Sequence, residues 1–381
     1  MWKWCLSALL GLVICGPAQA ISIRVIALDD TTSIAAQGIT PDGRYILIVT
    51  TPGYVGDQMD FYRWDRETGR FAHVGFAPVL GGDPVGMSVS DSGRFVTFTS
   101  PRYDENGKWD VYVRDLKTNL LRRVSAGKVK TTQHSLNGKI SGNGRFVVFE
   151  SAERTFVPGD TNGVSDIFVR DLLTGTMERA SIGMFGNQLT SNSSNPDISA
   201  DGRFIKFVSN ERVYLRDRRN GTTRIIDTSF RGQHTVYVPT SLLSANGRFL
   251  AFVDDFGGSP TTERLSVFVR DLQNNTTQPV DLDGKGNPLK GWSNVMSISP
   301  DGRFVMFSLN VPWGPGVAWG AKVVLRDRLL RKSEEMLPPV AGVDSYGGFV
   351  NGNGQLVAFT SDDYHPGGSA DYVLLRNRAA K

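Results

Sequence analysis

Short apolar runs alternate with polar turns along the chain, and one phrase returns at intervals. It reads DISADGRFIKFVS from Asp197 and SISPDGRFVMFS from Ser297: an apolar run, a tight Asp-Gly turn and an aromatic run. The phrase occurs seven times, at Gly43, Gly93, Gly144, Gly202, Gly247, Gly302 and Gly354. Because Gly and Asn adopt positive φ easily, each copy predicts a hairpin of two buried strands.

Each copy continues with two more short strands. The third strand ends in an Arg-Asp step, as at Asp115 and Asp271, and a Gly or Asn follows four residues later in the first five copies. The sixth copy has Arg331 at that place. Four antiparallel strands in each of seven repeats, spaced 45–58 residues apart, predict an all-β fold, a seven-bladed β-propeller.

The two ends of the chain predict how the ring closes. The third strand of the seventh copy stops at Asn377, only four residues before the end of the sequence. Ile21–Asp29 reads as a strand that belongs to no copy. We expect this segment to become the outer strand of the seventh blade, because that pairing covers two exposed sheet edges.

Residues 1–20 have the features of a secretion signal. Lys3 precedes an apolar run from Leu6 to Cys15, and a small-x-small motif ends at Ala20. We predict cleavage after Ala20, leaving residues 21–381 as one propeller domain in the periplasm or outside the cell. No later run of about 18 apolar residues predicts a membrane span.

The positions of the cysteines and the net charge exclude some kinds of chemistry for the mature chain. Both cysteines, Cys5 and Cys15, lie in the predicted leader, so no disulfide or thiol is expected after cleavage. A lipoprotein signal, the alternative, needs a small residue before Cys15, where Ile14 stands. The formal charge of +4 is small, and many arginines recur at fixed points of the repeat. We therefore expect no nucleic-acid partner.

The Ser-x-Asp-Gly-Arg turn, its aromatic strand and the strand ending in Asp resemble the TolB-type propeller family. The resemblance covers Gly38–Arg376 and implies a propeller fold. TolB has six blades behind a separate α/β domain, whereas seven copies follow the predicted leader here. Its contacts with a lipoprotein anchored near peptidoglycan are therefore not carried over.

Loops on one predicted face vary widely in length, whereas the turns on the opposite face are nearly constant. Variable loops on a rigid scaffold commonly build binding sites. The candidate contact residues on this face are Trp109, Trp292, Trp313, Trp319, Tyr346, Tyr364 and His365. We predict that those of the sixth and seventh blades bind a protein or cell-envelope component. The alternative is that they fill gaps between blades.

Two Asp-x-Asn-Gly loops precede the third strands of the second and third blades. Their oxygen-bearing side chains are candidate Ca²⁺ ligands: Asp104, Asn106, Asp110, Asp160, Asn162 and Asp166. Such a sequence also makes a turn that is capped by its own side chains, and we favour that interpretation. No other cofactor is expected.

The sequence contains neither of two local catalytic motifs. The four histidines have no H-E-x-x-H spacing, and no G-x-S-x-G elbow occurs. The Arg-Asp carboxylates recur from blade to blade, as structural groups do. We therefore expect an exported, non-catalytic binding propeller rather than an enzyme. The alternative is a carbohydrate-binding or glycan-cleaving propeller that assembles residues from several blades.

Overall fold

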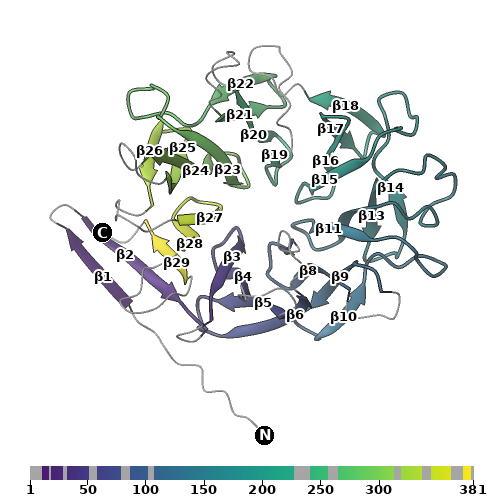
Figure 1. The fold of residues 1–381 in the computed structure, drawn as a ribbon, viewed down its shortest axis with the longest axis horizontal. Coiled ribbons are helices and arrows are strands. Elements are labelled where there is room, and N and C mark those ends of the chain that lie inside the picture. Colours follow the sequence, from purple (N-terminus) through teal and green to yellow (C-terminus); the bar gives the residue numbers. More distant parts are fainter. Residues whose placement is uncertain are drawn as a thin grey trace, which may run out of the picture.

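The computed structural model describes residues 11–16, 19–28, 32–50, 58–78, 86–101, 107–226, 241–255, 265–312, 319–336, 345–361 and 372–378. These residues form seven antiparallel sheets arranged as blades around a centre (Figure 1). The predicted all-β, seven-bladed propeller is confirmed. The part of the chain that the structure describes contains no helix able to cross a membrane.

Strand order in the first six blades follows the sequence from the centre outward, and the seventh blade takes its outer strand from the N-terminal segment. The inner strands are β3 (Ile34–Ile39), β7 (Ser88–Val89), β11 (Ser135–Ile140), β15 (Ser193–Ile198), β19 (Ser241–Leu243), β23 (Trp292–Ile298) and β27 (Ser345–Val350). The second strands are β4 (Tyr45–Thr50), β8 (Phe95–Ser100), β12 (Phe146–Ser151), β16 (Phe204–Ser209), β20 (Phe249–Asp255), β24 (Phe304–Pro312) and β28 (Leu356–Ser361). The third strands are β5 (Gln58–Asp65), β9 (Asp110–Asp115), β13 (Asp166–Asp171), β17 (Arg212–Asp217), β21 (Leu265–Asp271), β25 (Trp319–Asp327) and β29 (Tyr372–Asn377). The outer strands are β6 (Phe71–Pro78), β10 (Leu120–Arg123), β14 (Met177–Arg179), β18 (Thr222–Ile226), β22 (Thr276–Pro279), β26 (Lys332–Glu335) and β2 (Gln19–Ile26).

The repeated glycine is a contact point between blades. Gly202 has φ 77°, and a Cβ built on it would overlap the ring of Phe146 in the preceding blade. The same relation joins Gly93 to Tyr45, Gly144 to Phe95, Gly247 to Phe204, Gly302 to Phe249 and Gly354 to Phe304. In the first blade, Gly43 packs against Leu356 of the seventh. Each glycine therefore satisfies both a left-handed turn and a close approach between blades.

The second aromatic of the phrase fills the space between sheets. Its six copies, which are Phe98, Phe149, Phe207, Phe252, Phe307 and Phe359, all have fully buried side chains. Each lies in an apolar cluster that joins two neighbouring blades, and there is one such cluster at every junction of the ring. The core is thus a series of packed interfaces between sheets.

The arginine of the phrase ties its turn to the end of the third strand. In six blades it forms a salt bridge, namely Arg44–Asp65, Arg94–Asp115, Arg145–Asp171, Arg203–Asp217, Arg248–Asp271 and Arg303–Asp327. The hydrogen bond from Arg94 is the main cause that lowers the pKa of Asp115. The guanidinium also lies over the aromatic ring that follows it, at 4.6–4.9 Å from the ring centroid. This explains why arginine recurs there.

The predicted closure of the ring is confirmed. Ser22–Ile26 of β2 pair antiparallel with Val373–Asn377 of β29, so the N-terminal segment forms the outer strand of the seventh blade. Ile26 is buried in the cluster that joins the seventh and first blades. β1 (Gly11–Gly16), which lies in the predicted leader, adds a fifth strand outside β2. Because every residue paired with β29 follows Ala20, the closure would survive cleavage there.

One deviation from the repeat does not alter the backbone. Arg331 replaces the Gly or Asn of the turn between the third and fourth strands, yet its φ is 54°. The corresponding residues Asn119 and Asn275 both have φ 58°. The surrounding blade therefore imposes the left-handed turn even on an arginine, at a cost in backbone strain.

Two glycines of the fourth blade distinguish the cost of a left-handed backbone from the cost of a clash between blades. Gly221 also has positive φ, 66°, but a Cβ there would meet nothing within 4 Å. Gly221→Ala should cost about 1 kcal/mol of unfolding free energy, from backbone strain alone. Gly202→Ala should cost about 1–3 kcal/mol more, because it also overpacks Phe146. Urea unfolding of both variants measures the difference, and equal losses would contradict the interblade role.

Candidate functional site

The inner strands of all seven blades line a channel at the centre of the ring. Its cavity has a volume of about 260 Å³. Most of the lining is small or apolar, including Gly38, Leu242 and Phe349. The charged lining residues are Asp91, Lys139 and Asp197, which come from three consecutive blades. The charged residues of the channel are therefore gathered on one side.

Irregularities in two inner strands position Lys139 and Asp197 at the channel. β11 and β15 each contain a β-bulge, and the bulges hold Asn137 at φ 55° and Asn195 at φ 51°. Asparagine adopts this left-handed conformation more readily than most residues. Because a bulge changes which side chains face inward, Lys139 and Asp197, just after the two bulges, reach the channel.

A second layer of ionisable groups lies behind this wall. Lys206 of β16 is 2% exposed, and its Nζ donates hydrogen bonds to the backbone oxygens of Asn195 (2.9 Å) and Ser241 (2.7 Å). Glu150 of β12 accepts hydrogen bonds from the Asn195 backbone nitrogen (3.1 Å) and the Asn137 side-chain amide (2.9 Å). The asparagine bulges thus connect the channel wall to both buried groups.

Burial shifts the pKa of both groups toward the neutral form. Burial lowers the pKa of Lys206 from 10.5 to about 8, with the charge of Asp197 opposing the shift and that of Lys139 adding to it. Burial likewise raises the pKa of Glu150, against its two hydrogen bonds. The Asp197 carboxylate accepts hydrogen bonds from the backbone nitrogens of Ile198 and Leu243. Perturbed groups of this kind cluster at functional sites, although structural networks produce them too.

We call Asn137, Lys139, Glu150, Asp197 and Lys206 the polar wall. The sequence analysis did not select these residues. One signal was available, because Lys206 interrupts an apolar strand at a place where five other copies have Leu47, Val148, Ala251, Met306 and Ala358. A lysine in a buried strand position needs a specific partner or function.

The predicted aromatic contact surface is only partly within the described residues. Trp292 begins β23 and is 49% exposed. Trp109 is partly buried against the apolar cluster of the first two blades. Trp319 lies in β25 opposite Pro312, and Tyr346 lies in β27 opposite Thr360, but their side chains are not described. Trp313, Tyr364 and His365 lie outside the described residues. The contact surface stays a prediction.

The second Asp-x-Asn-Gly loop contains an ion-paired network. Arg179 Nη1 lies 3.5 Å from Asp160 Oδ1 and 3.7 Å from Asp166 Oδ2. Asn162 directs its side-chain amide nitrogen to Asp166 at 2.8 Å. In the first loop, Asp110 pairs with Arg123 at 3.1 Å. Asp104 and Asn106 lie outside the described residues. Calcium binding at these loops stays a prediction, and a cation there would compete with an arginine.

Histidines do not supply a metal site in the described part of the chain. His73 pairs with Asp60, and His134 accepts a hydrogen bond from the Trp109 backbone nitrogen, whereas His234 and His365 lie outside the description. Among the described residues, no group of three or more His, Cys, Asp or Glu could hold a metal ion.

Solved structures that resemble this chain are propellers. An oligogalacturonate lyase from Vibrio parahaemolyticus is 12% identical with a TM-score of 0.65, over 98% of this chain and 99% of that chain. An oligogalacturonate lyase in complex with manganese is 13% identical with a TM-score of 0.63, over 97% and 96%. The β-propeller domain of the Trilobed protease from Pyrococcus furiosus is 10% identical with a TM-score of 0.58, over 91% and 95%. No protein-family model and no curated protein matches the sequence.

At these identities the likeness concerns the fold alone. It supports a β-propeller, the fold that the resemblance of the repeat to TolB-type propellers implied. The comparison corrects the expected function, because two structures matching nearly the whole chain are enzymes that cleave a glycan. The expectation of a non-catalytic binding propeller, and of no enzyme, was wrong in this respect. It treated a lack of local motifs as a lack of chemistry, whereas a propeller brings residues from separate blades together at its channel.

Lys206 should make stability depend on pH. The unfolded chain binds this proton more tightly than the folded chain, so the free energy of unfolding should rise between pH 8 and 10.5. The full effect corresponds to about 3 kcal/mol. We expect urea unfolding across this range to show the rise in the wild-type protein and not in Lys206→Met. Lys290→Met, at an exposed position, should retain the rise, and parallel profiles for wild type and Lys206→Met would contradict this assignment.

Arg179 provides a test for calcium. Arg179→Met leaves Asp160 and Asp166 as buried carboxylates without their cation, which should cost about 3–5 kcal/mol. Millimolar Ca²⁺ should then raise the Tm of this variant more than the Tm of the wild type. Thermal unfolding in calcium and in chelator measures both, and an equal response would argue against cation binding at this loop.

Proposed function

We propose that this protein is an exported, carbohydrate-active propeller that binds a carboxylate-bearing glycan at its central channel and cleaves it by β-elimination. The observation that carries the proposal is Lys139. Lys139 is one of the residues that line the channel, and no carboxylate among the described residues forms an ion pair with it. An unpaired cation in a confined channel favours an anionic ligand.

The polar wall supports Lys139 in this role. Asp197 is one of the two carboxylates in the lining, but it accepts two backbone hydrogen bonds and interacts with the charge of Lys206. Lys206 also adds positive charge behind the wall at neutral pH. The electrostatic balance around Lys139 therefore leaves its charge available to a ligand carboxylate.

The proposed reaction follows from the ligand's chemistry. In a uronate, the carbon beside the carboxylate loses a proton to a base, the electron pair forms a double bond, and the bond to the glycosidic oxygen breaks. The leaving oxygen then takes up a proton. Neutralising the carboxylate makes the first proton more acidic, and we assign that role to Lys139.

Two observations favour a glycan over other anions as the ligand. The neighbours that match nearly the whole chain are lyases of oligogalacturonate, which is a glycan with a carboxylate on each sugar. Trp292, half exposed at the start of β23, offers an aromatic face of the kind that packs on sugar rings. Export agrees with the predicted leader, because such glycans occur outside the cytoplasm.

A metal is no part of the proposed mechanism. One neighbour was solved with manganese. Among the described residues, the channel lining contains no histidine, and its carboxylates are Asp91 and Asp197. The described residues also hold no group of three or more His, Cys, Asp or Glu, so we assign no step to a metal ion.

Turnover of a uronate glycan tests the proposal. We expect oligogalacturonate to give products with the ultraviolet absorbance of a conjugated double bond, and its methyl ester, which lacks the negative charge, to react much more slowly. Release of reducing ends without that absorbance would indicate hydrolysis instead. Failure to bind or cleave any member of a panel of uronate oligosaccharides would overturn the proposal.

Lys139 should control this activity. Lys139→Ala should lower kcat/KM by about 10–100-fold, which corresponds to the loss of a charged hydrogen bond worth about 1.5–3 kcal/mol. Lys139→Arg should recover part of the activity, because it retains the charge. Lys117→Ala removes an exposed lysine from a turn of the second blade and should leave the rate unchanged. Full activity in Lys139→Ala would exclude the assigned role.

A further inference from the structure

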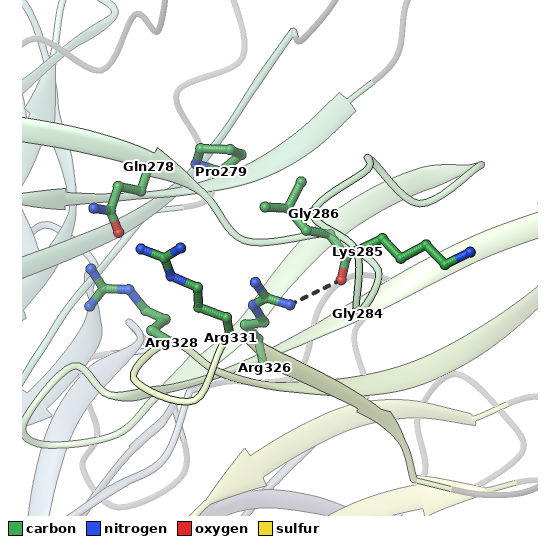
Figure 2. A pocket seen from close by; sticks show the side chains of 9 residues that line it. Gln278, Pro279, Gly284, Lys285, Gly286, Arg326, Arg328 and Arg331 are labelled. Carbon is green, nitrogen blue, oxygen red and sulfur yellow. Dashed lines mark hydrogen bonds between the residues drawn. The ribbon is translucent and has the colours of Figure 1, made fainter.

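A second pocket lies on the outer rim of the ring, between the fifth and sixth blades. Its cavity has a volume of about 380 Å³. Gln278 and Pro279 come from β22, and Leu282, Gly284, Lys285 and Gly286 come from the loop that follows. Arg326, Arg328 and Arg331 come from β25 and the turn after it. All three arginines line the pocket, and in Figure 2 the Gln278 amide faces the guanidinium group of Arg328.

Arg326 is fixed in place by the neighbouring blade. It is 5% exposed, and its Nη1 donates hydrogen bonds to the backbone oxygen of Leu282 (3.2 Å) and the hydroxyl of Ser333 (3.1 Å). Burial is the main cause that lowers the pKa of Arg326, and the charge of Arg331 is the next. The two guanidinium groups are therefore close enough to repel each other.

Arg328 donates a hydrogen bond to the backbone oxygen of Gly302 at 2.6 Å, as Arg218 and Arg378 do to Gly202 and Gly354, but it lacks the carboxylate partner of those two arginines. On the outer strand of the preceding blade, Arg218 meets Glu178 and Arg378 meets Glu334, in both cases as salt bridges. Gln278 occupies the same strand position, since it pairs with Val269 as Glu178 pairs with Val169 and Glu334 with Leu325. At this junction a neutral amide has replaced the carboxylate.

Arg331 adds a charge where the blade would accept glycine. Its φ of 54° is the conformation that Gly175 and Gly221 adopt at the same turn of other blades. An arginine is strained there, and its side chain contributes to the pocket. The backbone strain and the nearby charge of Arg326 both add to the cost of an arginine at this position.

The acidic groups that act on these arginines have other partners: Asp271, near Arg328, pairs with Arg248, and Asp327, near Arg326, pairs with Arg303. Lys285 is a fourth basic lining residue, although its side chain extends away from the arginines in Figure 2. Asp283, in the same loop, accepts hydrogen bonds from the backbone nitrogens of Lys285 and Asn287, both at 2.8 Å. Its other carboxylate oxygen accepts one from the Asn287 amide at 3.1 Å. That carboxylate is thus directed into its own loop.

We propose that this pocket is an oxyanion-binding site, in which Arg328 and Arg331, positioned beside Arg326, bind a phosphate, sulfate or carboxylate group. Guanidinium groups suit such ligands because each offers paired donors and a permanent charge. The volume leaves space for more than a single ion, so the group can belong to a modified sugar. This site is separate from the channel, and the proposal does not depend on glycan cleavage.

Thermal unfolding and titration calorimetry test the site with inorganic phosphate, sulfate and galacturonate as probes. We expect at least one probe to raise the Tm in a saturable way, whereas chloride at equal ionic strength does not. The strongest probe identifies whether an ester oxyanion or a carboxylate is the preferred ligand. No saturable shift with any of the three would overturn the proposal.

Two variants locate the binding while preserving the fold. Gln278→Glu recreates the pair seen at Arg218 and Arg378, so it should weaken probe binding at least about tenfold without lowering the Tm of the ligand-free protein. Arg331→Gly restores the residue type that other blades use, and should weaken binding equally. Lys332→Ala removes the same charge from the adjacent exposed position outside the pocket, and should bind as the wild type does. Unchanged binding in the first two variants, or an equal loss in the third, would show that the pocket is not the site.

Discussion

The close approach of each repeated glycine to the aromatic ring of the preceding blade is the contact on which the ring depends. A side chain at Gly202 would overlap Phe146, and the same geometry recurs from blade to blade. Backbone hydrogen bonds then join successive turns, as between Asn143 and Ala200 and between Asn246 and Pro300. The seventh blade meets the first through Gly43 and Leu356, and the Gly352 nitrogen donates to the Pro41 oxygen. Small residues at these turns allow seven sheets to meet around a narrow channel.

In this architecture, some charged side chains stabilise the turns by pairing with each other, whereas others remain available to bind a ligand. The arginine of the phrase is paired in six blades, and its partner aspartate is nearly buried, so these groups maintain the turns. The deviations from the repeat are therefore informative. Lys206 stands where other blades have small or apolar residues, Lys139 and Asp197 share a repeat position that is uncharged in the other blades, and Gln278 stands where two other junctions have glutamate. Both proposed sites arise at such deviations.

The two sites differ in how the ring creates them. The channel site needs side chains from consecutive inner strands, and asparagine bulges in β11 and β15 aim them inward. The rim site needs only one junction, where β22 and its following loop face β25 and the next turn. Substitutions at one site should therefore leave the other intact, because no side chain lines both cavities.

The sequence by itself determined the fold. Turn glycines, aromatic strands and the count of seven copies predicted the blades, and the unpaired strand at Ile21–Asp29 predicted the closure that β2 and β29 make. These features are local in sequence, because a strand, its turn and its partner lie within one repeat. The tertiary structure alone decided the candidate sites. Lys139, Asp197 and Lys206 lie in different strands, and Arg328 meets Gln278 only across a junction of blades. A pairing across blades leaves no spacing pattern in the sequence, so the unpaired charge appears only after the blades are packed.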